Sequence, residues 1–299
     1  MMEGKERVIN EEEEEEEERQ QVWSWGAGTE GQLATGKLQD EHLPCHLLPH
    51  IFNGGGGPIS VLSCGGAHVI CLTSGGRVLT WGRGTSGQLG HGERFNCLMP
   101  KPVESLDGLV VTHVSAGWSH SGFVTDSGNL FTCGDGSFGQ LGHGDYESHS
   151  FPVMVSYFTS KHVEQIACGM RHSLALLKGH CGDKVYGFGS GKRGQLGISK
   201  DKIGSICLPQ ITLGLQYVKI VSIHANGDHS AALSADGCLY TWGRGFSSNS
   251  DAYIPQCLSS SLSSIQVALG WNHALLLTGD GETYMLGGKH HGVLSTSME

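Results

Sequence analysis

A glycine-rich motif of thirteen residues, VLTWGRGTSGQLG at positions 78–90, recurs along the chain and most constrains how the chain can fold. Close copies occupy residues 22–34, 130–142 and 185–197, and weaker copies begin near residues 239 and 285. The steps between the first glycines of the four close copies are 56, 52 and 55 residues. These glycines, with that of the fifth copy, are Gly26, Gly82, Gly134, Gly189 and Gly243. A fixed period of this length predicts one repeat domain rather than two unrelated domains.

A second motif alternates with the first and contains a short apolar run, a glycine and a histidine. Its five histidines are His68, His120, His172, His229 and His273. In the fourth copy Asn226 stands where the other copies have glycine. Because each histidine belongs to a different repeat unit, the five are not expected to converge on one metal ion. We expect each imidazole instead to form a hydrogen bond with a backbone group of a neighbouring turn.

Both motifs read as short β-strands separated by turns. Runs of valine, isoleucine, leucine and tryptophan end at hairpin signals such as Ser74-Gly75-Gly76 and Asp126-Ser127-Gly128, and no window of a dozen residues has helical periodicity. Glycine supplies 47 of 299 residues, roughly twice the usual share of about 7%, and its positions follow the period. A unit of about four short strands cannot bury its faces alone. The sequence therefore predicts an all-β fold, a β-propeller of about five to six four-stranded blades.

Charge separates a tail, residues 1–20, from the repeat domain, residues 21–299. The tail has ten acidic and three basic residues, so it carries −7 of the total net charge of −10, and a block of like charge predicts a disordered segment. The tail could also act as a docking arm for basic partners such as histones. The remainder has no basic stripe, which argues against direct nucleic-acid binding. No apolar run is long enough for a membrane helix, and we expect an intracellular protein, nuclear or cytoplasmic.

Sets such as Gly82-x-Gly84-x-x-Gly87 match the dinucleotide-binding fingerprint. That fingerprint requires a following helix, whereas each copy here continues into Gln-Leu and a polar loop, so we expect turns and no cofactor. No catalytic set of residues stands out, which predicts that the protein is not an enzyme. The ten cysteines include no Cys-x-x-Cys pair, and Cys64 and Cys168 share a repeat position with small or apolar residues. We expect reduced thiols, with these two in the core.

The tryptophan-glycine motifs, combined with segments such as Gly117-Trp118-Ser119-His120, resemble the regulator of chromosome condensation repeat family. The resemblance covers residue 22 to about residue 295, and plant members with an acidic start, including the ultraviolet-B photoreceptor branch, are most similar. It implies a seven-bladed β-propeller whose members act through protein partners.

Three functions of different classes are compatible with this resemblance. The first is a non-catalytic scaffold or regulator that binds another protein, such as a small GTPase or a chromatin protein. The second, implied by the family, is guanine-nucleotide exchange on a Ran-type GTPase. The third is ultraviolet-B reception, which in that branch depends on tryptophans of a Gly-Trp-Arg-His-Thr motif in consecutive blades.

The chain departs from the photoreceptor motif. Only Trp118 and Trp271 occupy the tryptophan position, neither is followed by arginine, and they belong to non-adjacent blades. We expect the two rings to lie too far apart for close coupling, which needs centroids within about 7 Å. Trp118, Arg171 and Trp271 are instead candidate contacts for a protein partner.

Counting half-repeats predicts an incomplete ring. The tryptophan-glycine motif occurs six times and the histidine motif five times, and the last copies are eroded. An open arc leaves unpaired strand edges, at Val22 and in the last blade, that favour dimerisation. This interpretation describes a truncated isoform or fragment. The alternative is a tight six-bladed ring in which the strand at Val22 pairs with the segment after Tyr284.

Overall fold

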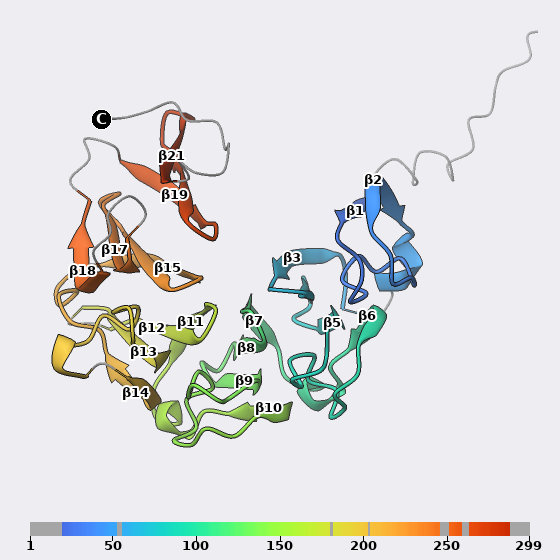
Figure 1. Cartoon of the computed structure of the whole chain (residues 1–299), viewed down its shortest axis with the longest axis horizontal. Helices are drawn as coiled ribbons and strands as arrows, with labels where there is room; N and C mark the ends of the chain where they lie inside the picture. The colour runs from blue at the N-terminus through green and yellow to red at the C-terminus, as the bar shows by residue number, and fades with distance from the viewer. Residues whose placement is uncertain are drawn as a thin grey trace, which may run out of the picture.

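The chain forms an open arc of β-sheets around a central channel in the computed structural model (Figure 1). The structure describes residues 20–52, 56–179, 182–202, 204–245, 251–258 and 263–287. The predicted disordered tail, apart from Gln20, lies outside these residues, as does the pair His290-His291. Within them, helical structure is limited to four 3-10 segments: η1 (Pro49–Phe52), η2 (Glu104–Leu106), η3 (Ser156–Phe158) and η4 (Lys200–Lys202). The prediction of an all-β fold is confirmed.

Four sheets have four antiparallel strands each, arranged in chain order. They are β3 (Ile59–Cys64), β4 (His68–Thr73), β5 (Val78–Gly82) and β6 (Cys97–Pro102); β7 (Val111–Ala116), β8 (His120–Thr125), β9 (Leu130–Gly134) and β10 (His149–Met154); β11 (Val163–Cys168), β12 (His172–Leu177), β13 (Lys184–Ser190) and β14 (Ser205–Ile211); and β15 (Ile220–Asn226), β16 (His229–Ser234), β17 (Leu239–Arg244) and β18 (Asp251–Cys257). The first sheet of the arc has two strands, β1 (Val22–Gly26) and β2 (Glu41–Leu47). The last has three, β19 (Ser264–Leu269), β20 (His273–Thr278) and β21 (Thr283–Gly287).

The two sequence motifs map onto fixed positions in each sheet. The histidine motif forms the first two strands, and its histidine is the first residue of the second strand, as His120 is in β8. The tryptophan-glycine motif forms the third strand, which reaches its glycine at a positive φ, +107° for Gly134. The outermost strand of every four-stranded sheet, and β2 as well, contains a proline. Proline cannot donate a backbone hydrogen bond, so it protects these outer edges from pairing with another chain.

The ends of the arc do not pair with each other in the described part of the chain. β1 pairs with β2 alone, starting at Val22↔Leu47, and β21 pairs with β20. The predicted incomplete arrangement of about five to six blades is therefore confirmed. The alternative ring closed through Val22 is not found among the described residues.

The core lies between neighbouring sheets rather than inside any one of them. Ile70 and Val78 of one sheet pack with Val111 and Phe123 of the next, and Phe123 is completely buried. The predicted core position of Cys168 is correct, but its counterpart Cys64 is exposed, because no preceding complete sheet covers that side of β3. All nine cysteines of the described residues are free. No helix among the residues that the structure describes is long and apolar enough to cross a membrane.

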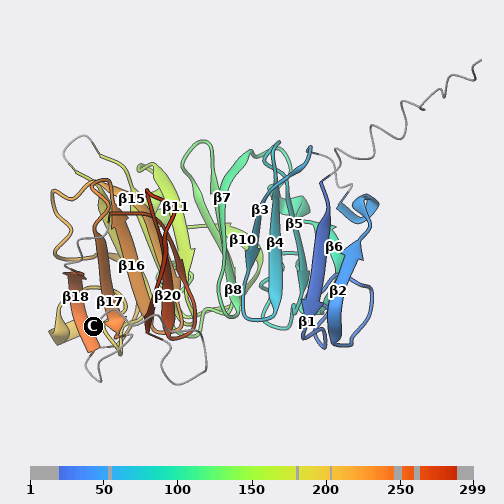
Figure 2. The same ribbon diagram turned by 90° about the horizontal axis from the view of Figure 1, so that it is seen from above.

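Seen from the side, the strands of each sheet run between the two faces of the arc (Figure 2). Loops of the same repeat position consequently gather on the same face. The loops that follow the inner strands β3, β7, β11, β15 and β19 meet at one end of the channel, and this end contains the candidate site.

Candidate functional site

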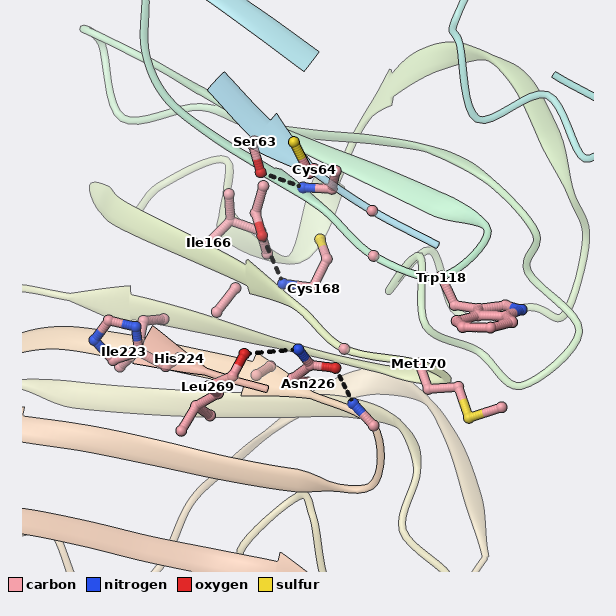
Figure 3. A pocket seen from close by; sticks show the side chains of 18 of the residues that line it. Ser63, Cys64, Trp118, Ile166, Cys168, Met170, Ile223, His224, Asn226 and Leu269 are labelled. Atoms are coloured by element: carbon pink, nitrogen blue, oxygen red, sulfur yellow. Dashed lines mark hydrogen bonds between the residues drawn. The ribbon is translucent and has the colours of Figure 1, made fainter. Parts of the chain in front are cut away.

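A cavity of about 520 Å³ occupies the central channel and is lined by the inner strands of the arc (Figure 3). Inner strands of neighbouring sheets are not paired with each other, so their exposed backbone groups need other partners. Side chains supply these partners. Ser63 accepts from the Ala116 N–H at 2.9 Å, Ser115 accepts from the Cys168 N–H at 2.9 Å, and Gln165 accepts from the Ile223 N–H at 3.2 Å. The polar lining of the channel thus has a structural cause.

Two histidines of this lining stay neutral at physiological pH. Burial lowers the pKa of His113 to about 4, and burial together with the nearby His113 lowers that of His224 to about 4. His113 accepts at Nδ1 from the Ile166 N–H, and His224 Nε2 lies 2.9 Å from the Ser222 hydroxyl. The described residues that line the channel therefore offer neutral hydrogen-bonding groups and no fixed charge.

We call one end of this cavity the channel mouth and define it by the five equivalent residues of the converging loops: Gly66, Trp118, Met170, Gly227 and Trp271. The indole rings of Trp118 and Trp271 are in contact, with centroids 5.6 Å apart and planes tilted by 54°. Both remain accessible, at 42% and 50% exposure. Met170 lies on the same side of the cavity as Trp118 (Figure 3).

The prediction that these two tryptophans lie too far apart is therefore wrong. Two whole sheets, β11–β14 and β15–β18, do separate them along the arc. However, the sheets curl around one narrow channel, so residues at the same repeat position face each other across it. Side chains from sheets that are not neighbours along the arc can therefore touch, because the shortest path between them runs straight across the channel.

One arginine contacts the tryptophan pair, and a second lies in a mouth loop. The Arg83 guanidinium carbon lies 6.0 Å from the Trp118 ring, and its Nη2 donates to the Trp118 carbonyl at 3.0 Å. Arg171, the predicted partner contact, is exposed and lies over the Phe138 ring at 4.9 Å. Cation–π contacts of this kind fix the guanidinium orientation while its N–H groups stay available. Arg83 carries no sequence signal of its own, since the equivalent positions hold Asp135, Ser190 and Arg244.

The repeat histidines hold neighbouring sheets together, but mostly not through the backbone bond that the sequence predicted. His68, His120 and His172 each place Nε2 at 2.8–2.9 Å from a serine hydroxyl of the next sheet, namely Ser121, Ser173 and Ser230. Each serine in turn donates to the carbonyl of a Gly-Gln-Leu glutamine, Gln88, Gln140 or Gln195, at 2.7–2.8 Å. The bridging serine therefore replaces the expected backbone acceptor, and the repeated His-Ser dipeptide was the signal that could have revealed it.

The fourth histidine behaves as predicted and donates to a backbone carbonyl. Ala274 replaces the serine in the last sheet, and His229 Nε2 lies 2.9 Å from the Gly270 carbonyl instead. The fifth histidine, His273, packs against Gly270, where an added Cβ would lie 2.2 Å from its ring. Burial lowers the pKa of His68 and His172 to about 3 and of His120 to about 4, so these imidazoles are neutral.

The remaining motifs have structural explanations. The glycines of the dinucleotide-like fingerprint form turns, as at Gly84, where an added Cβ would lie 1.9 Å from the Phe95 carbonyl. The residues that follow are turns rather than a helix. Among the residues that the structure describes, no three or more histidine, cysteine, aspartate or glutamate side chains form a group that could hold a metal ion.

Comparison with known proteins identifies the family to which this architecture belongs. The family model described as RCC1-like domain matches residues 21–298. The chain belongs to the RCC1-like family. Its relatives include the human E3 ubiquitin-protein ligase HERC2, 33% identical over 283 residues, which are 91% of this chain and 6% of that protein. The Arabidopsis thaliana ultraviolet-B receptor UVR8 is 32% identical over 284 residues, covering 92% of this chain and 62% of the receptor. The chain thus spans less than two thirds of either relative.

Solved structures agree with this assignment. The human WBSCR16 structure superposes with a TM-score of 0.75 at 26% identity, over 89% of this chain and 73% of that one. Prp20p from Saccharomyces cerevisiae, whose structure was described with its binding properties to Gsp1p and histones, gives a TM-score of 0.55 at 20% identity over 88% and 80%. The second likeness shows the fold alone. Both place this RCC1-like chain among propellers.

Proposed function

We propose that this RCC1-like chain is a non-catalytic protein-interaction propeller and that its channel mouth binds a protein partner. One observation carries the proposal: the rings of Trp118 and Trp271 are in contact with each other, yet the two side chains stay 42% and 50% exposed. Large aromatic side chains at the centre of a surface, flanked by arginine, are the residues that dominate binding energy in protein interfaces. Arg171 and Met170 extend the same surface.

The mouth also has the rigidity that binding favours. A backbone hydrogen bond links each of the first three loops to the next, as from the Trp118 N–H to the Gly169 carbonyl at 3.1 Å, and His229 links the fourth loop to the fifth. A surface already held in one conformation loses little entropy on association. The solved Prp20p structure, described with Gsp1p and histones, supports a protein rather than a nucleic-acid partner for this fold.

The test is capture of partners from cell extract by the tagged protein and by the Trp118→Ala/Trp271→Ala variant. The matched control is Tyr217→Ala, an aromatic residue that is 93% exposed and precedes β15 at the opposite end of the channel. We expect the double variant to lose specific partners and the control to retain them. Equal capture by all three proteins would contradict the proposal.

A GTPase among the captured proteins raises the alternative of guanine-nucleotide exchange. Release of labelled nucleotide from that GTPase, measured with catalytic amounts of the chain, distinguishes exchange from binding alone. A scaffold leaves the release rate unchanged, whereas an exchange factor accelerates it.

Ultraviolet-B reception is a second candidate that the tryptophan contact favours. The distance part of the argument against it is removed by the 5.6 Å separation, whereas the missing arginine after each tryptophan still counts against it. The 32% identity to the ultraviolet-B receptor UVR8 over 92% of this chain gives further support. The test is size-exclusion chromatography before and after ultraviolet-B irradiation. A receptor changes its association state on irradiation and loses that response in Trp271→Phe, whereas an unchanged elution profile speaks against light reception.

A further inference from the structure

A buried side-chain amide of the sheet β3–β6 lacks the acceptor that its counterparts have. Three of the four glutamines of the Gly-Gln-Leu motif, Gln88, Gln140 and Gln195, are at most 1% exposed, whereas Gln32 is only partly buried. In each, the side-chain oxygen accepts from a backbone N–H two residues earlier, at 2.8–2.9 Å, so the amide nitrogens point the same way. A buried N–H group without a hydrogen-bond acceptor lowers the stability of the fold, and folded proteins normally provide such a group with an acceptor.

Two of the three amides donate to a carboxylate. Gln140 Nε2 lies 3.1 Å from Asp135 Oδ2, and Asp135 follows the motif glycine of the same sheet. Gln195 Nε2 lies 3.3 Å from Asp228 Oδ1, and Asp228 precedes the histidine of the next sheet. The fold thus has two positions from which a carboxylate can accept a hydrogen bond from the glutamine Nε2.

In the sheet β3–β6 neither position holds a carboxylate. Arg83 stands at the first and Ser119 at the second, and within the described residues Gln88 Nε2 has no hydrogen-bond partner. Arg83 Nη2 reaches toward the Ser119 hydroxyl at 3.5 Å and the Trp118 carbonyl at 3.0 Å. No described carboxylate forms an ion pair with Arg83. A cation and an orphan donor therefore stand where the neighbouring sheets contain an anion.

We propose that Arg83, Gln88 and Ser119 receive a carboxylate supplied by the binding partner, an aspartate or glutamate side chain that docks beside Trp118. This inference rests on the proposed function of the channel mouth and names the chemistry of its partner. A guanidinium and a carboxylate are complementary in geometry and charge. The N–H groups of Arg83 and Gln88, together with the Ser119 hydroxyl, can donate to both oxygens of the carboxylate. Arg83 is only partly buried, so it makes the first contact, and the carboxylate reaches Gln88 as the arginine side chain turns outward.

The test uses a fluorescently labelled peptide of eight glutamates, with an eight-glutamine peptide as the uncharged control, and measures binding by anisotropy. Arg83→Asp installs the carboxylate found at the equivalent position 135, which satisfies Gln88 internally and repels the peptide. We expect at least tenfold weaker binding in Arg83→Asp and in Arg83→Ala. Arg94→Ala is the matched control, because Arg94 lies on the same face and, within the described part of the chain, donates to the Ser148 carbonyl alone.

The side-chain amide signal of Gln88 in a nitrogen-proton correlation spectrum gives a second readout. It shifts when the glutamate peptide saturates the wild-type protein and stays in place with Arg83→Asp. No binding by the wild type, equal weakening in Arg94→Ala, or an unmoved Gln88 signal at saturation would each overturn the inference. Loss of cellular partners in the tryptophan variant but not in Arg83→Asp would keep the proposed function and reject the carboxylate.

Discussion

Replacing Ser173 by alanine tests how the arc is held together. Ser173 is completely buried in β12 and lies between two groups of the preceding sheet. Its hydroxyl donates to the Gln140 carbonyl at 2.8 Å and accepts from His120 Nε2 at 2.8 Å. Because the hydroxyl hydrogen is used toward the carbonyl, the imidazole must supply the other hydrogen, which fixes its tautomer.

The alanine leaves two buried polar groups without this partner. A buried donor or acceptor left unsatisfied costs about 1–3 kcal/mol, so we expect the free energy of unfolding to fall by about 3 kcal/mol. His120 lacks the free carbonyl that His229 uses. His229 uses the Gly270 carbonyl, which is open because the Gly227 N–H bonds to the Asn226 side chain instead. The carbonyl equivalent for His120, that of Gly169, already accepts from the Trp118 N–H.

Urea unfolding followed by far-ultraviolet circular dichroism measures the effect. Ser74→Ala, in an exposed turn and without a side-chain hydrogen bond among the described residues, is the control and should change stability by less than about 0.5 kcal/mol. A Ser173→Ala variant as stable as this control would refute the claim that the serine bridges stabilise the packing of neighbouring sheets.

Four further outcomes follow from the same structure. Burial lowers the pKa of His120 to about 4, against about 6.5 in the unfolded chain, so the unfolded chain binds a proton at higher pH than the folded chain does. The free energy of unfolding should therefore fall as the pH drops from about 6.5 to about 4, by about 2 kcal/mol at pH 5 from this residue, and urea unfolding at several pH values measures it. Gly134→Ala should destabilise far more than Gly26→Ala in thermal melts, because both glycines have φ near +105° but an added Cβ clashes with backbone at 2.4 Å only at Gly134. Asp183→Ala should cost about 2 kcal/mol in chemical denaturation, since it leaves the buried N–H of Ile220 without its acceptor at 2.8 Å. Trp25→Glu, on the unpaired edge strand β1 where Trp25 is 59% exposed, should reduce self-association in light scattering, and unchanged association would show that this edge is not a contact.

The architecture was predictable because its determinants are local and repeated. The glycine at each third-strand end marks a positive φ, and the alternation of two motifs fixes which strands share a sheet. One contact between sheets was not predicted. The side chain of Asp183 accepts from the Ile220 N–H, whereas in the preceding sheet the Gly128 carbonyl accepts from the equivalent N–H of Val163. Substitution of a side chain for a backbone group leaves no periodic trace in the sequence.

The site was predictable in its residues but not in its geometry. Trp118, Arg171 and Trp271 were identified from their repeat position, and their role as partner contacts stays a prediction. The contact between the two tryptophans depends on the summed rotation of four successive sheets, which no single repeat encodes. Arg83 and Gln88 were missed because Arg83 stands where the next sheet has Asp135, the acceptor for its buried glutamine. That difference becomes informative only once the hydrogen bonds of the neighbouring sheets are known.

Within a mouth loop, the residues that support the fold differ from those that we propose to contact a partner. In the first three mouth loops the glycine at the start is packed against the histidine ring, as at Gly169, where an added Cβ would lie 2.3 Å from His172. The histidine at the end of each of these three loops is held by the inter-sheet serine. The two residues between them, such as Met170 and Arg171, enter neither the core nor the serine bridge, so substitutions there cost little stability. A repeat fold can therefore change its partner by changing these pairs alone, since function resides in sites built on a scaffold that is kept constant. By this reasoning we propose that binding specificity lies in Trp118, Arg171 and Trp271 of the mouth loops rather than in the strands that make the chain an RCC1-like propeller.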